Sequence, residues 1–118
     1  MTETQLDRFI NYAKTLKGSD IYYRESWGCY YFSLLGKSFG MLKPEYLTLK
    51  GDPEENNALR DMYSDVIPGY YSNKVHWNSI VLPTDQLSHE EIEKMILKSY
   101  TLVYANLSKK NKMVIDAL

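Results

Sequence analysis

Apolar residues return every three or four positions along the first segment of the chain, which predicts an amphipathic helix ended by Gly18. From Ile21 onward the apolar period changes to two, which predicts a strand. Both faces of that strand are largely apolar, so we expect it to lie inside a sheet. The helix stripe consists of Leu6, Phe9, Ile10, Ala13 and Leu16, and the strand faces consist of Tyr30, Phe32 and Leu34 against Cys29, Tyr31, Ser33 and Leu35.

Turn residues divide the following segment into two more strands. Gly36 and Lys37 predict a tight turn, after which residues 38–43 return as the second strand of a hairpin. Pro44 ends this strand. Residues 46–50 alternate again as a third strand, with Leu47 and Leu49 on its core face.

Two capping signals predict helices in the second half of the chain. Asp52 and Pro53 suit the first positions of a helix that ends near Ser64, and Glu55 completes a box-like cap. Ser88 and Glu91 form a second capping box. The expected buried stripes are Ala58, Leu59, Met62 and Tyr63 in the first helix, and Ile92, Met95, Ile96, Ser99 and Val103 in the second.

Between these helices, residues 76–82 predict a strand that Pro83 ends. A short terminal helix follows Ser108, and the lysines in its first turn oppose the helix dipole. The order is helix, three strands, helix, one or two strands, helix and helix. Hairpins in place of regular crossovers predict a single domain over residues 1–118, of the α+β class, with an antiparallel sheet and helices in two layers.

The composition sets limits on function. The 118 residues carry a net charge of −1, which argues against a whole-surface role in nucleic-acid binding but allows a local patch. Eleven tyrosines suit half-buried sheet faces, and binding surfaces second. A lone cysteine, Cys29, excludes an internal disulfide and a cysteine-based zinc site, and we expect a buried, inert thiol. We expect a cytoplasmic protein without membrane segment, metal or cofactor.

Polar, aromatic and titratable residues gather between Pro68 and Ser79. Asn73 and Lys74 lie in a predicted loop, where we expect their side chains to be free to meet an anion such as phosphate. A solvated loop is the alternative. Together with Lys50 and the tail lysines they form a candidate nucleic-acid patch, with tyrosines available for stacking. The candidate residues are Lys50, Tyr70, Tyr71, Asn73, Lys74, Lys109 and Lys110.

Other residues of this segment predict structural roles. We expect His76 and Asn78 to hydrogen-bond the turn at Pro68 and Gly69 and to hold the loop, while Trp77 packs in the core. The second histidine, His89, lies in a helix's first turn and is expected to be solvated. Catalysis by His76 is the less favoured interpretation, because the sequence shows neither an orienting partner nor a substrate pocket. No nucleophile elbow and no phosphate-binding glycine loop is present.

An ordered series of motifs resembles the MmcQ/YjbR family over residues 47–112. It comprises Leu49-Lys50-Gly51-Asp52-Pro53, Arg60, Val66-Ile67-Pro68-Gly69-Tyr70, Asn73-Lys74, His76-Trp77-Asn78-Ser79, Ser99-Tyr100 with Leu102-Val103, and Leu107-Ser108-Lys109-Lys110. The first third is similar in pattern only. Ser108 stands where the family usually has proline, which we expect to relax the last turn.

The resemblance implies a fold similar to that of type III secretion chaperones and frataxin-like proteins. It also implies a "double wing" DNA-binding label, which is itself an analogy of fold. The leading interpretation is therefore a small, non-enzymatic DNA-binding protein. The alternative is a protein-interaction or chaperone-like adaptor that forms a homodimer or binds a protein partner through its tyrosines and a sheet edge.

Overall fold

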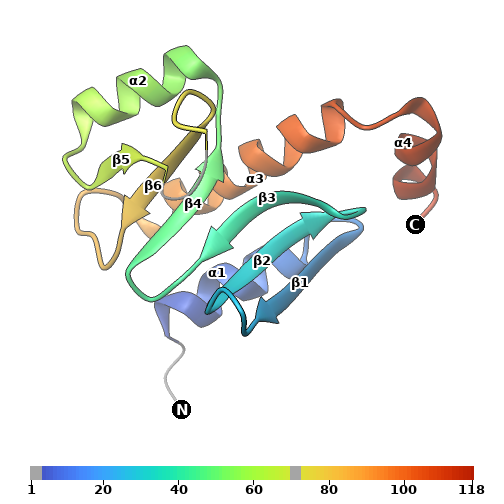
Figure 1. The fold of residues 1–118 in the computed structure, drawn as a ribbon, viewed down its shortest axis with the longest axis horizontal. Coiled ribbons are helices and arrows are strands. Elements are labelled where there is room, and N and C mark those ends of the chain that lie inside the picture. Colours follow the sequence, from blue (N-terminus) through green and yellow to red (C-terminus); the bar gives the residue numbers. More distant parts are fainter. Residues whose placement is uncertain (1–3, 70–72) are drawn as a thin grey trace.

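The computed structural model describes residues 4–69 and 73–118 as one sheet with helices (Figure 1). The elements are α1 (Gln5–Lys14), β1 (Ser19–Arg24), β2 (Cys29–Leu34), β3 (Lys37–Leu42), β4 (Tyr46–Lys50), α2 (Pro53–Met62), β5 (Val66–Pro68), β6 (Trp77–Val81), α3 (His89–Ala105) and α4 (Lys109–Asp116).

The strands form a six-stranded sheet in the order β1-β2-β3-β4-β6-β5, with antiparallel neighbours throughout. In Figure 1, α1 and α3 lie behind the sheet, and α4 lies beyond the end of α3. An ion pair between Glu55 and Lys98 joins α2 to α3. The predicted α+β class with an antiparallel sheet flanked by helices is confirmed.

The first predicted strand is in fact two strands. Residues 25–28 form a turn, so that β1 and β2 make a hairpin with Tyr22 opposite Tyr31. The prediction of one strand was wrong because apolar and aromatic residues occur on both sides of this turn. In the next hairpin Leu35 and Gly36 make the turn, both with positive φ, and Lys37 already belongs to β3. Two central residues with positive φ are typical of the two-residue turns that join antiparallel strands.

Helix α2 differs most from its prediction. Asp52 caps it by accepting a hydrogen bond from the Glu54 N–H at 3.2 Å, as expected. The side chain of Glu55 pairs with Lys98 instead of completing a capping box. The predicted apolar stripe is wrong at Met62, which is 70% exposed, and at Ala58, which is exposed too. It is confirmed at Leu59 and Tyr63, which are half-buried against the core, and the fully buried residue of the helix is Asn56. Helix α2 and its C-cap Tyr63 therefore contact the rest of the domain through polar groups as well as through Leu59 and Tyr63.

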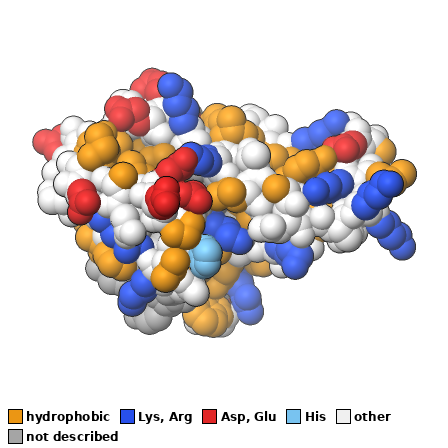
Figure 2. Space-filling view, turned by 90° about the horizontal axis from the view of Figure 1, so that it is seen from above, with side chains coloured by type: hydrophobic (Ala, Val, Ile, Leu, Met, Phe, Trp, Pro, Cys, Tyr) orange, Lys and Arg blue, Asp and Glu red, His pale blue; other side chains and the backbone are white. Residues whose placement is uncertain are grey.

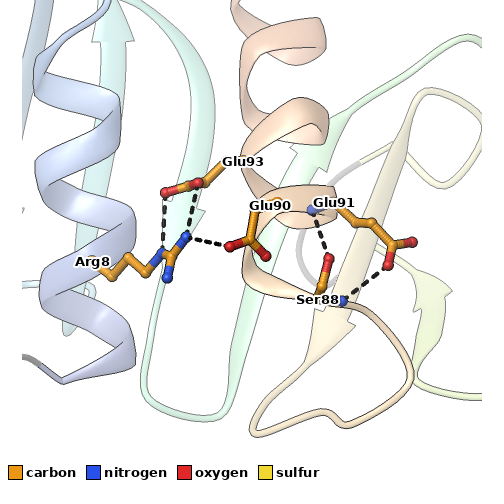
Figure 3. Close-up of polar contacts among 5 residues, drawn as sticks. All are labelled: Arg8, Ser88, Glu90, Glu91 and Glu93. Carbon is orange, nitrogen blue, oxygen red and sulfur yellow. Dashed lines mark hydrogen bonds and ion pairs between the residues drawn. The ribbon is translucent and has the colours of Figure 1, made fainter.

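Helices α1 and α3 are joined by a branched ion pair (Figure 3). The Arg8 Nη2 atom lies 3.2 Å from a carboxylate oxygen of Glu90 and 3.2 Å from one of Glu93. A backbone hydrogen bond at the start of α3, together with Arg8, lowers the pKa of Glu90. Figure 3 also shows the predicted capping box of Ser88 and Glu91, which is confirmed. His89 is half-buried against the Phe9 ring, so the expectation of a solvated side chain was wrong.

Helix α4 begins at a cap that the likeness to the family did not predict. The Ser108 side chain accepts a hydrogen bond from the Asn111 N–H at 3.1 Å, so serine at the usual proline position starts the helix rather than relaxing it. The Tyr104 hydroxyl donates to Asp116 at 2.7 Å, and the Lys17 ammonium donates to the Asp116 carbonyl at 3.2 Å. These bonds fix α4 against α3 and the segment between α1 and β1.

The core lies between the sheet and helices α1 and α3. Its largest fully buried side chains include Phe9, Phe32 and Phe39. Most of the predicted α3 stripe reaches this core, with Ile92, Ile96, Ser99 and Val103 buried. The half-buried apolar residues packed against it include five tyrosines: Tyr12, Tyr30, Tyr63, Tyr100 and Tyr104.

A single helix hydroxyl joins two strands where the sheet divides. Strands β3 and β4 pair only as far as Gly40 and Leu49, so the next possible pair is Phe39 with Lys50. At that point the Ser99 hydroxyl accepts a hydrogen bond from the Lys50 N–H at 2.9 Å and donates one to the Phe39 carbonyl at 2.6 Å. Ser99 is fully buried. Its hydroxyl thus replaces the direct hydrogen bonds that the strands no longer make.

We expect Ser99→Ala to lower the free energy of unfolding by about 1–3 kcal/mol, because it leaves the buried Phe39 carbonyl and the part-buried Lys50 N–H without the Ser99 hydroxyl. The Lys50 amide should also exchange with deuterium faster. Thr101→Ala is the matched control, since the Thr101 hydroxyl bonds the Leu97 carbonyl on the exposed side of the same helix. Urea unfolding measures both variants, and equal destabilisation would contradict the bridging role.

Candidate nucleic-acid interface

The predicted segment after Pro68 is held by helix α2. The Arg60 guanidinium donates from Nε to the Asn78 side-chain oxygen at 2.6 Å, and its Nη2 donates to the carbonyls of Lys74 and Trp77. The Asn56 amide donates to the Val75 carbonyl at 3.2 Å, and the Asn78 amide donates to the Asn56 carbonyl at 3.1 Å. The predicted partner of Asn78 was wrong, because its side chain bonds Arg60 and Asn56 of α2 rather than the turn at Pro68.

The turn at Pro68 is instead closed by backbone contacts. The Gly69 N–H donates to the Trp77 carbonyl at 3.0 Å, and Pro68 lies opposite Asn78 in the register of β5 and β6. A Cβ atom at Gly69 would lie 2.8 Å from the Cβ of Trp77, so only glycine fits without displacement. Trp77 is half-buried and lies outside the core cluster, which corrects its predicted core position.

Asn73 and Lys74 are exposed, but their side chains already bind within the chain. The Asn73 side-chain oxygen accepts hydrogen bonds from the N–H groups of Val75 and His76, at 2.8 and 3.3 Å. The Lys74 ammonium donates to the Gly69 carbonyl at 3.0 Å. The expectation that both side chains are free was therefore wrong. The Lys74 charge remains at the surface, and its role towards an anion stays a prediction.

Lys50 and His76 line one hollow of about 260 Å³. Its other lining residues are Gly51, Asp52, Pro53, Leu102 and Asn106. The His76 carbonyl accepts a hydrogen bond from Gly51 N–H at 2.9 Å, while its side chain is exposed. We call Lys50, Lys74 and His76 the loop patch. Among the described residues, His76 makes its hydrogen bonds through its backbone N–H and carbonyl, and these do not orient its ring as a catalytic base.

The tail lysines lie on α4, which begins shortly after Asn106 of the hollow. Lys109 and Lys110 are exposed in its first turn, and the Lys112 ammonium lies 5.8 Å from the Tyr104 ring. Figure 2 shows several basic side chains at the end of the molecule formed by α4, and acidic ones over α2. Tyr70 and Tyr71, the predicted stacking residues, lie outside the described residues, so their role stays a prediction.

A cluster of aromatic and basic side chains on the sheet was not predicted from the sequence. Alternation along the strands directs one set of side chains from β1, β2, β3 and β4 away from α1 and α3. The rings of Tyr22 and Tyr31 stack at 5.9 Å, and the Arg24 guanidinium lies 5.3 Å from the Tyr31 ring and 6.0 Å from the Trp27 ring. We call this set the aromatic face: Tyr22, Arg24, Trp27, Tyr31, Met41, Lys43 and Tyr46.

Cys29 lies beneath the aromatic face and is 4% exposed, which agrees with the expected buried position. Burial raises the pKa of its thiol, and Lys43 opposes this shift only in part. Burial also raises the pKa of Tyr31. Both groups are therefore neutral at physiological pH, and the charges of the aromatic face come from Arg24 and Lys43.

Within residues 4–69 and 73–118, no group of three or more histidine, cysteine, aspartate or glutamate side chains is placed to hold a metal ion. In the same part of the chain, no helix is both long enough and apolar enough to cross a membrane.

Comparisons with known proteins decide the family. The model of the YjbR family matches residues 16–102, which is most of the chain. The chain belongs to the YjbR family. An uncharacterised protein YbdF from Escherichia coli O157:H7 is 34% identical over 86 residues, which cover 69% of each chain. The predicted relationship is thus confirmed, and it extends into the N-terminal strands, where the sequence alone showed only a similar pattern.

Two solved structures share the fold of this YjbR-family chain. A Deinococcus radiodurans protein with domain DUF419 superposes with a TM-score of 0.83 at 24% identity, covering 98% of this chain and 92% of its own. A Pseudomonas syringae protein gives a TM-score of 0.69 at 24% identity, covering 80% and 95%. At this identity the likeness concerns the fold, and fold does not determine function.

The YjbR-type loop depends on Asn78, so we expect Asn78→Ala to lower the free energy of unfolding by about 2 kcal/mol. The change removes the partner of the Arg60 Nε and of the Asn56 carbonyl. Asn57→Ala on the exposed side of α2 is the control and should change stability by less than about 0.5 kcal/mol. Thermal and urea unfolding test the pair, and a neutral Asn78→Ala variant would refute the clamp.

Proposed function

We propose that this YjbR-family chain is a small, non-enzymatic, cytoplasmic DNA-binding protein that contacts phosphates through the loop patch and the lysines of α4. The observation that carries the proposal is the shared hollow of Lys50 and His76, beside which α4 begins. Lysine binds phosphate as a point charge, and such contacts supply most of the sequence-independent affinity for DNA. The DNA-binding label of the family also supports this proposal.

The position of Lys50 supports this function. Its N–H is held by the buried Ser99 hydroxyl, so the backbone that carries the charge is fixed before any ligand arrives. Asp52 also lines the hollow, but its carboxylate accepts a hydrogen bond from the start of α2. The net charge of −1 means that attraction to DNA must be local rather than spread over the surface.

Duplex DNA binding measured by fluorescence anisotropy tests the proposal. With Z phosphate contacts, log K should fall against log salt with a slope near −0.9Z. A Lys50→Ala, Lys109→Ala, Lys110→Ala triple variant should flatten that slope by about 0.9 for each lysine that binds a phosphate in the wild type. Lys74 is kept because its ammonium also bonds Gly69.

The control for this series is Lys94→Ala, which removes the same charge from an exposed position of α3. Lys94 lies two turns before Leu102 of the hollow, about 12 Å along the helix. It should bind DNA with the wild-type slope. Absence of binding at low salt, or equal effects of Lys94→Ala and the changes at Lys50 and α4, would reject DNA binding through this patch.

A second candidate function is that of a protein-interaction adaptor, and the β1 edge favours it. Strand β1 is at the edge of the sheet, and its Tyr22 and Tyr23 are 40% and 51% exposed. An uncovered edge strand presents unpaired N–H and C=O groups that a second chain can pair with.

Self-pairing through β1 predicts a homodimer. Light scattering over a range of protein concentrations should then give a mass that rises towards twice the 13.8 kDa of one chain. A mass that stays at one chain at every concentration excludes the homodimer.

A further inference from the structure

We propose that the aromatic face is a second nucleic-acid site, which binds an unpaired base of a single strand together with its phosphate. This inference rests on the proposed nucleic-acid function and adds the kind of strand that is bound. It concerns residues that the loop patch does not include, on the hairpins of β1–β2 and β3–β4.

The aromatic face contains a pocket with the size and lining that a planar ring requires. The pocket has a volume of about 210 Å³ and is lined by Ser26, Trp27, Cys29, Met41, Lys43 and Tyr46. Trp27 is 52% exposed at its border. A large aromatic residue is therefore left about half exposed beside an open pocket, an arrangement that favours binding over core packing.

Two cations flank the pocket. The Arg24 guanidinium lies over the Trp27 and Tyr31 rings, and the Lys43 ammonium lies 5.9 Å from the Tyr46 ring. These contacts hold the charged groups at the border of the pocket. The neighbouring carboxylates of Glu25 and Glu45 do not line it. A ligand with an aromatic ring and an attached anion matches this arrangement.

Single-stranded nucleic acid is the ligand class that fits these groups. Proteins bind single strands by stacking bases on exposed aromatic rings and tracking the backbone with cations, and each stacked base contributes substantially to affinity. In a duplex the bases are already stacked on one another, so their faces do not reach a pocket in a sheet. The aromatic face should therefore prefer unpaired strands, whereas the loop patch contacts phosphates of either form.

The two tryptophans of the chain report the two sites separately. Trp27 lies at the pocket, and Trp77 lies directly opposite Lys50 of the loop patch. Each indole N–H gives its own signal in a ¹⁵N–¹H spectrum of the full chain, and Trp27→Phe assigns them. The probes are an oligothymidylate and an oligouridylate of about 12 nucleotides, and a DNA duplex of the same length.

We expect both single strands to shift the Trp27 signal, with or without Trp77, and the duplex to shift Trp77 alone. Trp27→Ala should weaken oligothymidylate binding about 10-fold or more, and Trp27→Phe less, because phenylalanine keeps a ring for stacking. Tyr23→Ala is the matched control. Tyr23 is 51% exposed on the same hairpin, but its ring packs edge-on against Tyr30, and its replacement should change binding little.

The outcomes separate the two proposals. If every nucleic acid shifts Trp77 and none shifts Trp27, the aromatic face is not a site while the proposed function stands. If single strands shift Trp27 and the duplex shifts nothing, the aromatic face stands and duplex binding by the loop patch fails. Equally weakened binding by Trp27→Ala and Tyr23→Ala, with unshifted Trp27, overturns the stacking role. A shift of Trp27 by only one of the two oligonucleotides supports the site and identifies DNA or RNA as its preferred strand.

Discussion

The arrangement of this domain depends on the hydroxyl group of Ser99. Strands β3 and β4 begin as an ordinary antiparallel pair and separate beyond Gly40 and Leu49. A separated pair would leave the buried Phe39 carbonyl and the part-buried Lys50 N–H unpaired, which costs about as much free energy as removing a hydrogen bond. Ser99 satisfies both from α3, so that helix position, strand separation and the placement of Lys50 are fixed together. The backbone of Lys50, one residue of the loop patch, is therefore held by a buried side chain of α3.

Helix α2 likewise adds polar contacts to the apolar packing of Leu59 and Tyr63. Its inner side carries Asn56 and Arg60, which bond the strand and loop around Asn78. Hydrogen bonds of this kind have strict geometry, so they fix the orientation of the loop more narrowly than apolar packing does. The loop gains a defined shape, and Asn73 and Lys74 have less freedom to bind elsewhere.

Helix caps, which depend on neighbouring residues, were predictable from the sequence. The side-chain contacts that only the folded chain creates were not. The caps at Asp52 and Ser88 depend on residues three or fewer positions away, so their patterns predicted the helix starts. The Lys74 ammonium, in contrast, binds a carbonyl that only the folded loop brings near. The aromatic face was missed for a related reason. Tyr22 meets Tyr31 only once the turn over residues 25–28 is placed, and the apolar alternation had predicted one strand there.

Strand β4 relates the two proposed sites to each other. Tyr46 lines the pocket of the aromatic face and Lys50 lines the hollow of the loop patch, four positions further along the same strand. The two positions are about 13 Å apart along the strand. The pocket lies on the side of the sheet that faces away from α1 and α3, whereas the hollow is also lined by Leu102 and Asn106 of α3. Thr48 lies between them, buried and hydrogen-bonded to Ser79 at 2.6 Å, which keeps this part of the strand rigid. A chain with a net charge near zero can thus offer cations and an aromatic pocket at two fixed points of one strand, while acidic residues gather over α2.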